Sequence, residues 1–322
     1  MGRAERAIAV VAGVIVIALV AAYLALQRPD IAWSTLEAKY GDARSRYMDL
    51  PDGVRVHYRD QGNPAGPPVV MVHGFSASLQ AWEPWVARLG KDYRIVTLDL
   101  PGHGLTRAPA GYVASIDGYA DLVDAVARSL KLDRYVVVGN SMGGAVAWDD
   151  ALRHPGDVRG LVLVDAAGWP SKARAGGGPL IFRILGNPIG RALVRDLDMR
   201  PLIKSGLQSA YLDKSLVTPA LVDRYVELSR APGHRDILLT IRERPAGAPV
   251  TAETFNAIHV PTLVMHGQSD ALIPVADGHA FAAAIPGARL IVYPGVGHVP
   301  MEQIPGRSAA DLRLFLAGLG PS

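Results

Sequence analysis

The chain has 322 residues, of which 49% are hydrophobic and 20% are charged, with a formal net charge of +3 and no cysteine. High apolar content with low net charge excludes an intrinsically disordered chain. The absence of cysteine excludes disulfide scaffolds, thiol nucleophiles and cysteine-ligated metals. The even charge balance argues against a nucleic-acid partner. The length suits two domains or one large α/β domain with an insertion.

The first feature along the chain is an apolar run, residues 7–26, that contains no charged residue. As a helix it would extend about 30 Å, the thickness of the hydrocarbon core of a bilayer. A cleaved signal peptide is the alternative, but its apolar core is usually only about 7–15 residues long. The run therefore predicts an uncleaved single-pass anchor within residues 1–28. Arg3 and Arg6 favour a cytoplasmic N-terminus, which would place the rest of the chain on the outer, periplasmic or extracellular, side.

Residues 29–45 are expected to form a linker with a short helix, and residues 46–168 and 256–322 carry alternating strand and helix patterns. Short apolar or alternating runs predict strands at 54–58, 69–72, 94–99, 135–138, 161–164, 262–265 and 290–293. Helical spacing of apolar residues predicts helices at 81–89, 116–130, 142–152, 275–284 and 306–319. This alternation implies an α/β fold with a mostly parallel central sheet flanked by helices.

Residues 169–255 interrupt the alternation and are predicted to form a helical cap. The segment starts rich in glycine and proline, at residues 176–179, and its clearest amphipathic helix is expected at 221–228. Residues 171–247 contain 13 Lys or Arg and 7 Asp or Glu, so they carry +6 while the remainder carries −3. Two interpretations stay open: a solvated charged face, or a basic cap that meets anionic lipid or an anionic substrate.

Residues 139–143, Gly-Asn-Ser-Met-Gly, match the pattern G-x-S-x-G. A predicted strand precedes them and a predicted helix follows, which is the context in which a tight turn exposes a serine hydroxyl above a sheet edge. An incidental serine in a glycine-rich turn is the alternative. The context favours Ser141 as a nucleophile.

A serine hydroxyl needs a base to take its proton and an acid to orient that base. His298 lies in a loop after the last predicted strand, from which it can reach Ser141, and is the candidate base. The other histidines are interpreted as structural or as lacking a matching acid and turn: His57, His73, His103, His154, His234, His259, His266 and His279. Asp270 follows the strand at 262–265 and is the candidate acid, with Asp165 as its competitor.

Negative charge that develops on a substrate oxygen requires N–H donors. The N–H of Met142, next to the nucleophile at a helix N-terminus, and that of Phe75, in the loop after the strand at 69–72, are the expected donors. The chain order Ser141, Asp270, His298 is typical of one fold.

These motifs together resemble the α/β-hydrolase superfamily over about residues 46–319. The motifs that carry the resemblance are His73-Gly-Phe75, Asp99-Leu-Pro-Gly-His-Gly104, Gly139-Asn-Ser-Met-Gly143, Gly267-Gln-Ser-Asp270 and Gly297-His298. The serine at 141 argues against the haloalkane dehalogenase and epoxide hydrolase branches, which use aspartate there. The resemblance implies a helical cap after the sixth strand. The resemblance is greatest to membrane-anchored bacterial hydrolases of the esterase or lipase kind. It extends to the meta-cleavage-product C–C hydrolases, but these are soluble proteins and the predicted anchor differs from them.

The sequence therefore predicts a serine hydrolase that cleaves carboxylic esters through an acyl-enzyme on Ser141. C–C bond hydrolysis or acyl transfer by the same triad is the close alternative, and a non-catalytic binding protein of this fold is a more distant one. Its expected partners are a small, apolar ester or acyl substrate and the membrane through residues 7–26. No cofactor or metal is expected, and the oligomeric state is left open.

Overall fold

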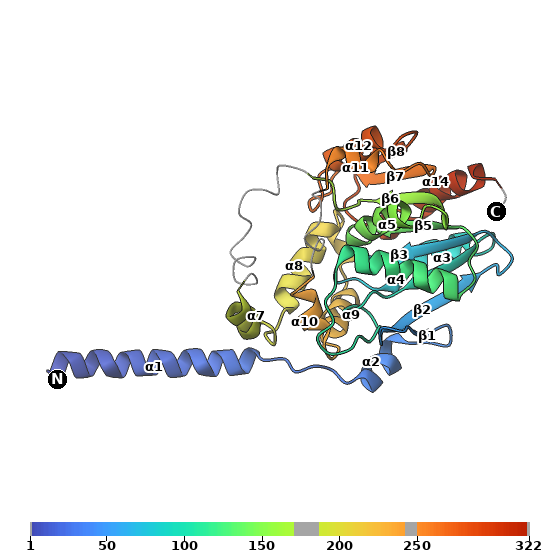
Figure 1. The fold of residues 1–322 in the computed structure, drawn as a ribbon. Coiled ribbons are helices and arrows are strands. Elements are labelled where there is room, and N and C mark those ends of the chain that lie inside the picture. Colours follow the sequence, from blue (N-terminus) through green and yellow to red (C-terminus); the bar gives the residue numbers. More distant parts are fainter. Residues whose placement is uncertain (1, 171–186, 242–249, 321–322) are drawn as a thin grey trace.

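A computed structural model describes residues 2–170, 187–241 and 250–320 of the chain (Figure 1). Its eight-stranded sheet has the order β1-β2-β4-β3-β5-β6-β7-β8. The strands are β1 (Arg46–Asp49), β2 (Arg55–Gly62), β3 (Pro68–Val72), β4 (Arg94–Leu98), β5 (Tyr135–Asn140), β6 (Val158–Val164), β7 (Thr262–Gly267) and β8 (Arg289–Tyr293). β1 and β2 pair antiparallel, as do β2 and β4, and the other neighbours are parallel. The predicted mostly parallel sheet is confirmed.

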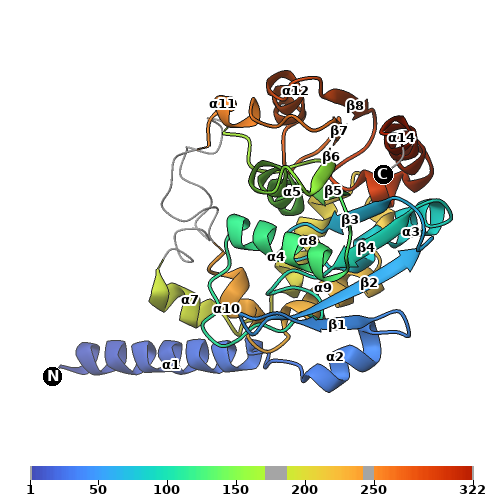
Figure 2. The ribbon, with the colours of Figure 1, turned by 45° about the vertical axis from the view of Figure 1, so that its right-hand side comes forward.

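Helices cover both faces of the sheet (Figure 2). One face packs against α4 (Ile116–Ser129), α5 (Met142–Arg153) and α12 (Val275–Ala284), and the other against α3 (Glu83–Leu89) and α14 (Pro305–Gly318). Side chains of a strand point alternately to the two faces. In β3, for example, Val70 and Val72 join the first core while Val69 and Met71 join the second. Strands buried on both faces explain why their sequences read as continuous apolar runs.

The predicted helices and strands recur within a few residues of their expected bounds, but one strand and some short helices were not expected. β1 was not expected, because Arg46–Asp49 is a short edge strand without an apolar run. Edge strands face water along one side, so their composition carries little signal. The remaining helices of the core are the short η1 (Leu79–Trp82), α11 (Ala252–Phe255) and α13 (Pro300–Gln303).

The predicted insertion after the sixth strand is helical. Its described elements are α7 (Pro188–Val194), α8 (Arg200–Ala210), η3 (Lys214–Leu216), α9 (Pro219–Ser229) and α10 (His234–Leu238). The helix expected at 221–228 is confirmed within α9. The glycine- and proline-rich start at 176–179, and six of the charges counted in the basic cap, lie outside the described residues. Leu207, Val222 and Val226 of the cap join the core on the α3 and α14 face.

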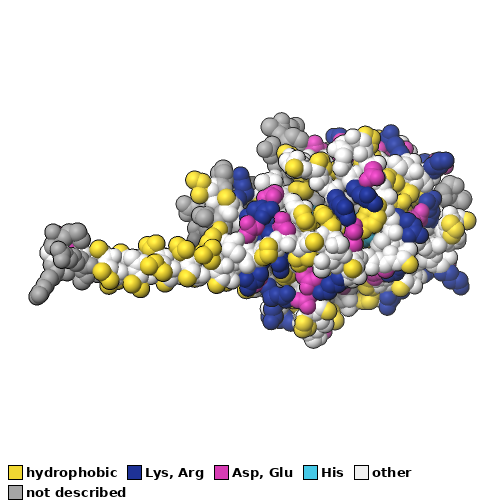
Figure 3. All heavy atoms as spheres, turned by 90° about the horizontal axis from the view of Figure 1, so that it is seen from below, with side chains coloured by type: hydrophobic (Ala, Val, Ile, Leu, Met, Phe, Trp, Pro, Cys, Tyr) yellow, Lys and Arg dark blue, Asp and Glu magenta, His cyan; other side chains and the backbone are white. Residues whose placement is uncertain are grey.

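The apolar run forms α1 (Arg3–Leu26), which projects from the body as an isolated rod (Figure 1). Within it, Ile8–Leu26 is long and apolar enough to cross a membrane, and none of it is buried in the protein. A signal sequence near an N-terminus meets the same criteria. Figure 3 shows hydrophobic side chains along the rod and charged side chains gathered where it meets the body.

The residues after α1 are hydrogen-bonded to the cap, and the short helix expected in the linker is α2 (Trp33–Tyr40). The backbone N–H of Arg28 donates to the carbonyl of Asp196 at 2.6 Å, and that of Asp198 donates to Leu26 at 2.9 Å. The buried guanidinium of Arg235 donates to the carbonyl of Arg28 at 2.7 Å and pairs with Asp30 at 2.5 Å. These contacts hold the end of α1 against the cap.

Replacing Arg235 tests how much this junction stabilises the cap. Arg235→Ala removes the donor of the Arg28 carbonyl and leaves Asp30 without its closest cation, so we expect the free energy of unfolding to fall by roughly 2 kcal/mol. Thermal unfolding of the full chain in detergent measures this change. Arg153→Ala is the control, because its ion pair with Asp121 is solvent-exposed and is expected to contribute less than about 1 kcal/mol. Equal shifts in the two variants would contradict the junction's role.

Candidate active site

Ser141 occupies a strained turn between β5 and α5. Its backbone φ of 54° lies in the left-handed region, which residues other than glycine rarely adopt. The turn fits because its neighbours lack side chains: a Cβ on Gly139 would lie 1.9 Å from the carbonyl oxygen of Gly143, and one on Gly143 would lie 2.2 Å from that of Val72. The expected tight turn at Ser141 is therefore present, at the carboxyl edge of the sheet.

His298 and Asp270 form a buried pair. The Nδ1 atom of His298 lies 2.7 Å from Oδ2 of Asp270, and their side chains are 6% and 0% exposed. The other oxygen of Asp270 accepts backbone N–H bonds from Leu272 at 2.8 Å and Ile273 at 3.0 Å. Burial opposes the charged form of Asp270, but the hydrogen bond and charge of His298 and the two N–H groups outweigh it and hold its pKa below the usual value. A carboxylate that remains ionised can orient an imidazole through Nδ1–H.

Backbone contacts hold this pair beside the turn that carries Ser141. The side-chain amide of Asn140 donates to the carbonyl of His298 at 3.1 Å and to that of Val164 at 3.1 Å. The backbone N–H of His298 donates to the carbonyl of Ala210, the last residue of α8, at 2.8 Å. The residue before Ser141 and the end of a cap helix thus both fix the backbone of His298.

The N–H groups of Phe75 and Met142 lie at the same edge of the sheet. A Cβ on Gly74, the residue before Phe75, would lie 3.1 Å from Cβ of Ser141, so this loop passes directly beside the turn. Met142 is the first residue of α5. Neither N–H donates to any residue that the structure describes, which leaves both able to bind a ligand oxygen.

Asp165, the competing acid, ends β6 and lies beside Asp270, not beside His298. One of its oxygens accepts the N–H of Gly267 at 2.8 Å. His266, for which the sequence offered no matching acid, is 3.7 Å from Asp165 and 3.6 Å from Asp270, and that interpretation is wrong. Its Nε2–H donates to the carbonyl of Ile273 at 3.1 Å. Neighbouring parallel strands end at the same edge of a sheet, which would have indicated that the ends of β6 and β7 meet.

His73 and His103 brace loops, as expected. His73 donates from Nδ1 to the carbonyl of Gly74 at 2.8 Å and accepts the N–H of Leu100 at Nε2, at 3.1 Å. His57 instead has an acid partner that the sequence did not suggest: its Nδ1 is 2.7 Å from Oδ2 of Asp99. Both side chains are fully buried, and Asp99 also accepts the N–H groups of Leu79 and Leu105. Leu79 begins η1, directly after the loop that carries Phe75, so this pair supports the end of that loop.

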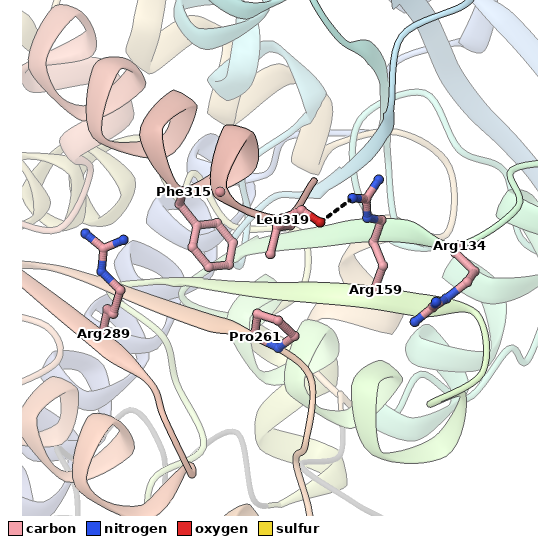
Figure 4. A pocket seen from close by; sticks show the side chains of 7 residues that line it. Arg134, Arg159, Pro261, Arg289, Phe315 and Leu319 are labelled. Carbon is pink, nitrogen blue, oxygen red and sulfur yellow. Dashed lines mark hydrogen bonds between the residues drawn. The ribbon is translucent and has the colours of Figure 1, made fainter. Parts of the chain in front are cut away.

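One pocket in the described parts of the chain lies away from the candidate triad. It has a volume of about 490 Å³ and is lined by Arg134, Arg159, Pro261, Arg289, Phe315, Gly318 and Leu319. Figure 4 shows these side chains around the starts of β6, β7 and β8. Catalytic and binding groups of open α/β sheets lie beyond the carboxyl ends of the strands. Ser141 lies at that edge, whereas this pocket lies at the opposite one. We therefore place the candidate active site at Ser141 and not in this pocket.

Comparison with known proteins agrees with this architecture. A family model described as the alpha/beta hydrolase family matches residues 69–311, and the chain belongs to this family of hydrolases. The chain is 30% identical over 274 residues to a 2-hydroxymuconate semialdehyde hydrolase of Pseudomonas sp. (strain CF600), covering 82% of this chain and 91% of the relative.

Two solved structures extend this comparison. An esterase from Rhodococcus sp. ECU1013 has 28% identity and a TM-score of 0.70, covering 86% of this chain and 100% of the esterase. A membrane phospholipase A, described as a bacterial virulence factor, has 24% identity and a TM-score of 0.70, with 100% of both chains covered. The second likeness concerns the fold alone.

The close approach at Gly143 predicts that its substitution disrupts the edge of the sheet. A Cβ in Gly143→Ala would lie within 2.5 Å of the carbonyl oxygens of Val72 and His73, so we expect the free energy of unfolding to fall by about 3 kcal/mol. Thermal unfolding measures it. Gly156→Ala is the matched control, because no atom of the described residues, apart from its chain neighbours, lies within 4 Å of its added Cβ. If Gly143→Ala and Gly156→Ala had the same melting temperature, β3 and α5 would not be packed this closely.

Proposed function

We propose that the protein is a serine hydrolase of carboxylic esters, with Ser141 as nucleophile, His298 as base and Asp270 as orienting acid. The observation that carries the proposal is the buried pair of His298 and Asp270. The backbone carbonyl of His298 accepts a hydrogen bond from the side chain of Asn140, the residue before the strained Ser141. Strain of this kind persists where the surrounding structure maintains it and is concentrated at functional sites. An incidental serine would not need it.

The reaction follows from these positions. Ser141 Oγ attacks the ester carbonyl carbon while His298 takes its proton, and the N–H groups of Phe75 and Met142 stabilise the resulting oxyanion. Collapse of the tetrahedral intermediate transfers that proton to the departing alcohol and leaves an acyl-serine. Water, deprotonated by His298, then releases the carboxylic acid. Asp270 stays ionised throughout and stabilises the imidazolium.

C–C bond hydrolysis by the same residues is the second candidate, and the 30% identity to a semialdehyde hydrolase favours it. The two reactions share the nucleophile and differ in what enters the pocket. Acyl transfer would differ only in the acceptor that replaces water.

The apolar helix α1 leads us to propose that the chain is anchored in a membrane, with the hydrolase domain on the outer side. None of the spanning segment is buried against the described residues, so its apolar surface is left for lipid to cover. A membrane-attached hydrolase would meet apolar esters where they concentrate, so we propose an apolar ester or acyl compound as substrate.

A fluorophosphonate probe tests the nucleophile. We expect the wild type to be labelled, and Ser141→Ala to lose labelling and at least about 10⁴-fold in ester hydrolysis, because removal of the nucleophile disables the whole triad. Ser129→Ala, which removes an exposed hydroxyl from α4, is the control and should match the wild type. An unlabelled wild type would refute an activated serine, whereas a labelled Ser141→Ala would place the nucleophile elsewhere. Turnover of a vinylogous diketone but of no p-nitrophenyl ester would overturn the esterase assignment in favour of C–C hydrolysis.

Charges at the centre of α1 test the anchor. Val14→Arg with Ile17→Arg should release the chain from the membrane fraction, because each arginine costs about 2.5–3.5 kcal/mol at the middle of a spanning helix. Carbonate extraction followed by immunoblotting measures this, with Val14→Leu and Ile17→Leu as the matched control. If intact mass shows that the mature protein begins after residue 26, α1 is a signal peptide and the anchor proposal fails.

A further inference from the structure

Asp165 is a buried carboxyl group that the proposed reaction does not use. It is 0% exposed, and its φ of 46° lies in the left-handed region. One of its oxygens, one of Asp270 and a ring nitrogen of His266 lie within 4.8 Å of one another. Oδ1 accepts the N–H of Gly267, whereas Oδ2 is buried and has no hydrogen-bond partner among the residues that the structure describes. A carboxylate in this position would lose hydration without replacement.

The charges around Asp165 do not balance if both carboxyl groups are ionised. Among residues 2–170, 187–241 and 250–320, neither Asp165 nor Asp270 is paired with Lys or Arg. The titratable groups that face Asp165 are Asp270, His266 and, from β8, Tyr293. His266 is kept neutral, because burial lowers its pKa. A base that awaits a substrate proton is also neutral, so two carboxylates would face each other without a cation.

We propose that Asp165 is a positioning residue: a neutral carboxyl group that shares its proton with Asp270 and fixes the acid of the proposed triad. This rests on the proposed function for its catalytic consequence. Asp270 has two N–H donors on Oδ1, and a carboxylic O–H from Asp165 would add a further donor to the same carboxylate. The pair then carries one negative charge, which the imidazolium balances during the reaction. Burial, followed by the charge of Asp270, raises the pKa of Asp165 well above its usual value, in agreement with this arrangement.

The decisive variant is Asp165→Asn, which keeps the shape and a donor while removing the ability to ionise. If Asp165 is already neutral, the acid limb of the pH profile of kcat/KM, or of fluorophosphonate labelling, stays where it is in the wild type. If Asp165 is ionised, it stabilises the imidazolium of His298, and its neutralisation moves that limb to lower pH by about one unit or more. Asp165→Ala removes the donor, and we expect kcat to fall about tenfold with KM unchanged, with Asp165→Asn restoring it.

Stability provides a readout that does not depend on activity. A group that keeps its proton when folded contributes fully below its unfolded pKa, near 4, and loses that contribution as pH rises. The melting temperature of full-length Asp165→Asn, relative to the wild type, should therefore rise between pH 4 and pH 8 by roughly 2–4 °C per pH unit, until Asp165 ionises. Asp133→Asn, an exposed control, should show no such trend.

The two readouts separate the possible failures. A melting-temperature difference that falls as pH rises would show an ionised Asp165 and overturn the proposal. An acid limb displaced to lower pH in Asp165→Asn would overturn it as well. A wild type that is not labelled by the probe would refute the serine hydrolase function, while the stability trend would still decide the protonation of Asp165.

Discussion

The close approach of backbone around Ser141 is the constraint on which the rest of the site depends. Because Gly139 and Gly143 have no side chains, α5 can start almost in contact with the ends of β3 and β5. That contact forces Ser141 into a positive φ and brings the loop of Phe75 beside it. The strain is sustained by strands buried on both faces, so the large hydrophobic core stabilises a local conformation that the turn would not adopt alone.

Electrostatics imposes a second constraint, because the candidate acid, Asp270, is buried beside a second carboxyl group, that of Asp165. Asp270 remains ionised through three donors, His298 and the N–H groups of Leu272 and Ile273. Another full charge at Asp165 would have no cation to balance it among the described residues. The same water exclusion that strengthens the His298–Asp270 hydrogen bond therefore makes a second carboxylate expensive.

Periodicity in the sequence was enough to predict the sheet, most helices and the inserted cap, because buried parallel strands and amphipathic helices have distinct apolar patterns. It missed β1, whose edge position leaves no such pattern. It also gave His266 and His57 no acidic partner. Asp165, near His266, and Asp99, bonded to His57, follow neighbouring strands and come close only through strand order. Triad candidates were easier to find, because G-x-S-x-G and the chain order of the acid and base depend on the fold as a whole.

The cap is held at two places by contacts with distant parts of the chain, which the sequence alone did not predict. At one end, Arg235 and the backbone of Asp196 hold the residues that follow α1. At the other, the carbonyl of Ala210 accepts the backbone N–H of His298. Both ends involve backbone groups, which a nearby side-chain substitution can displace without removing any candidate catalytic group. The cap therefore joins the end of the apolar helix to the loop of the candidate base, so its position and that of the His298 backbone are coupled.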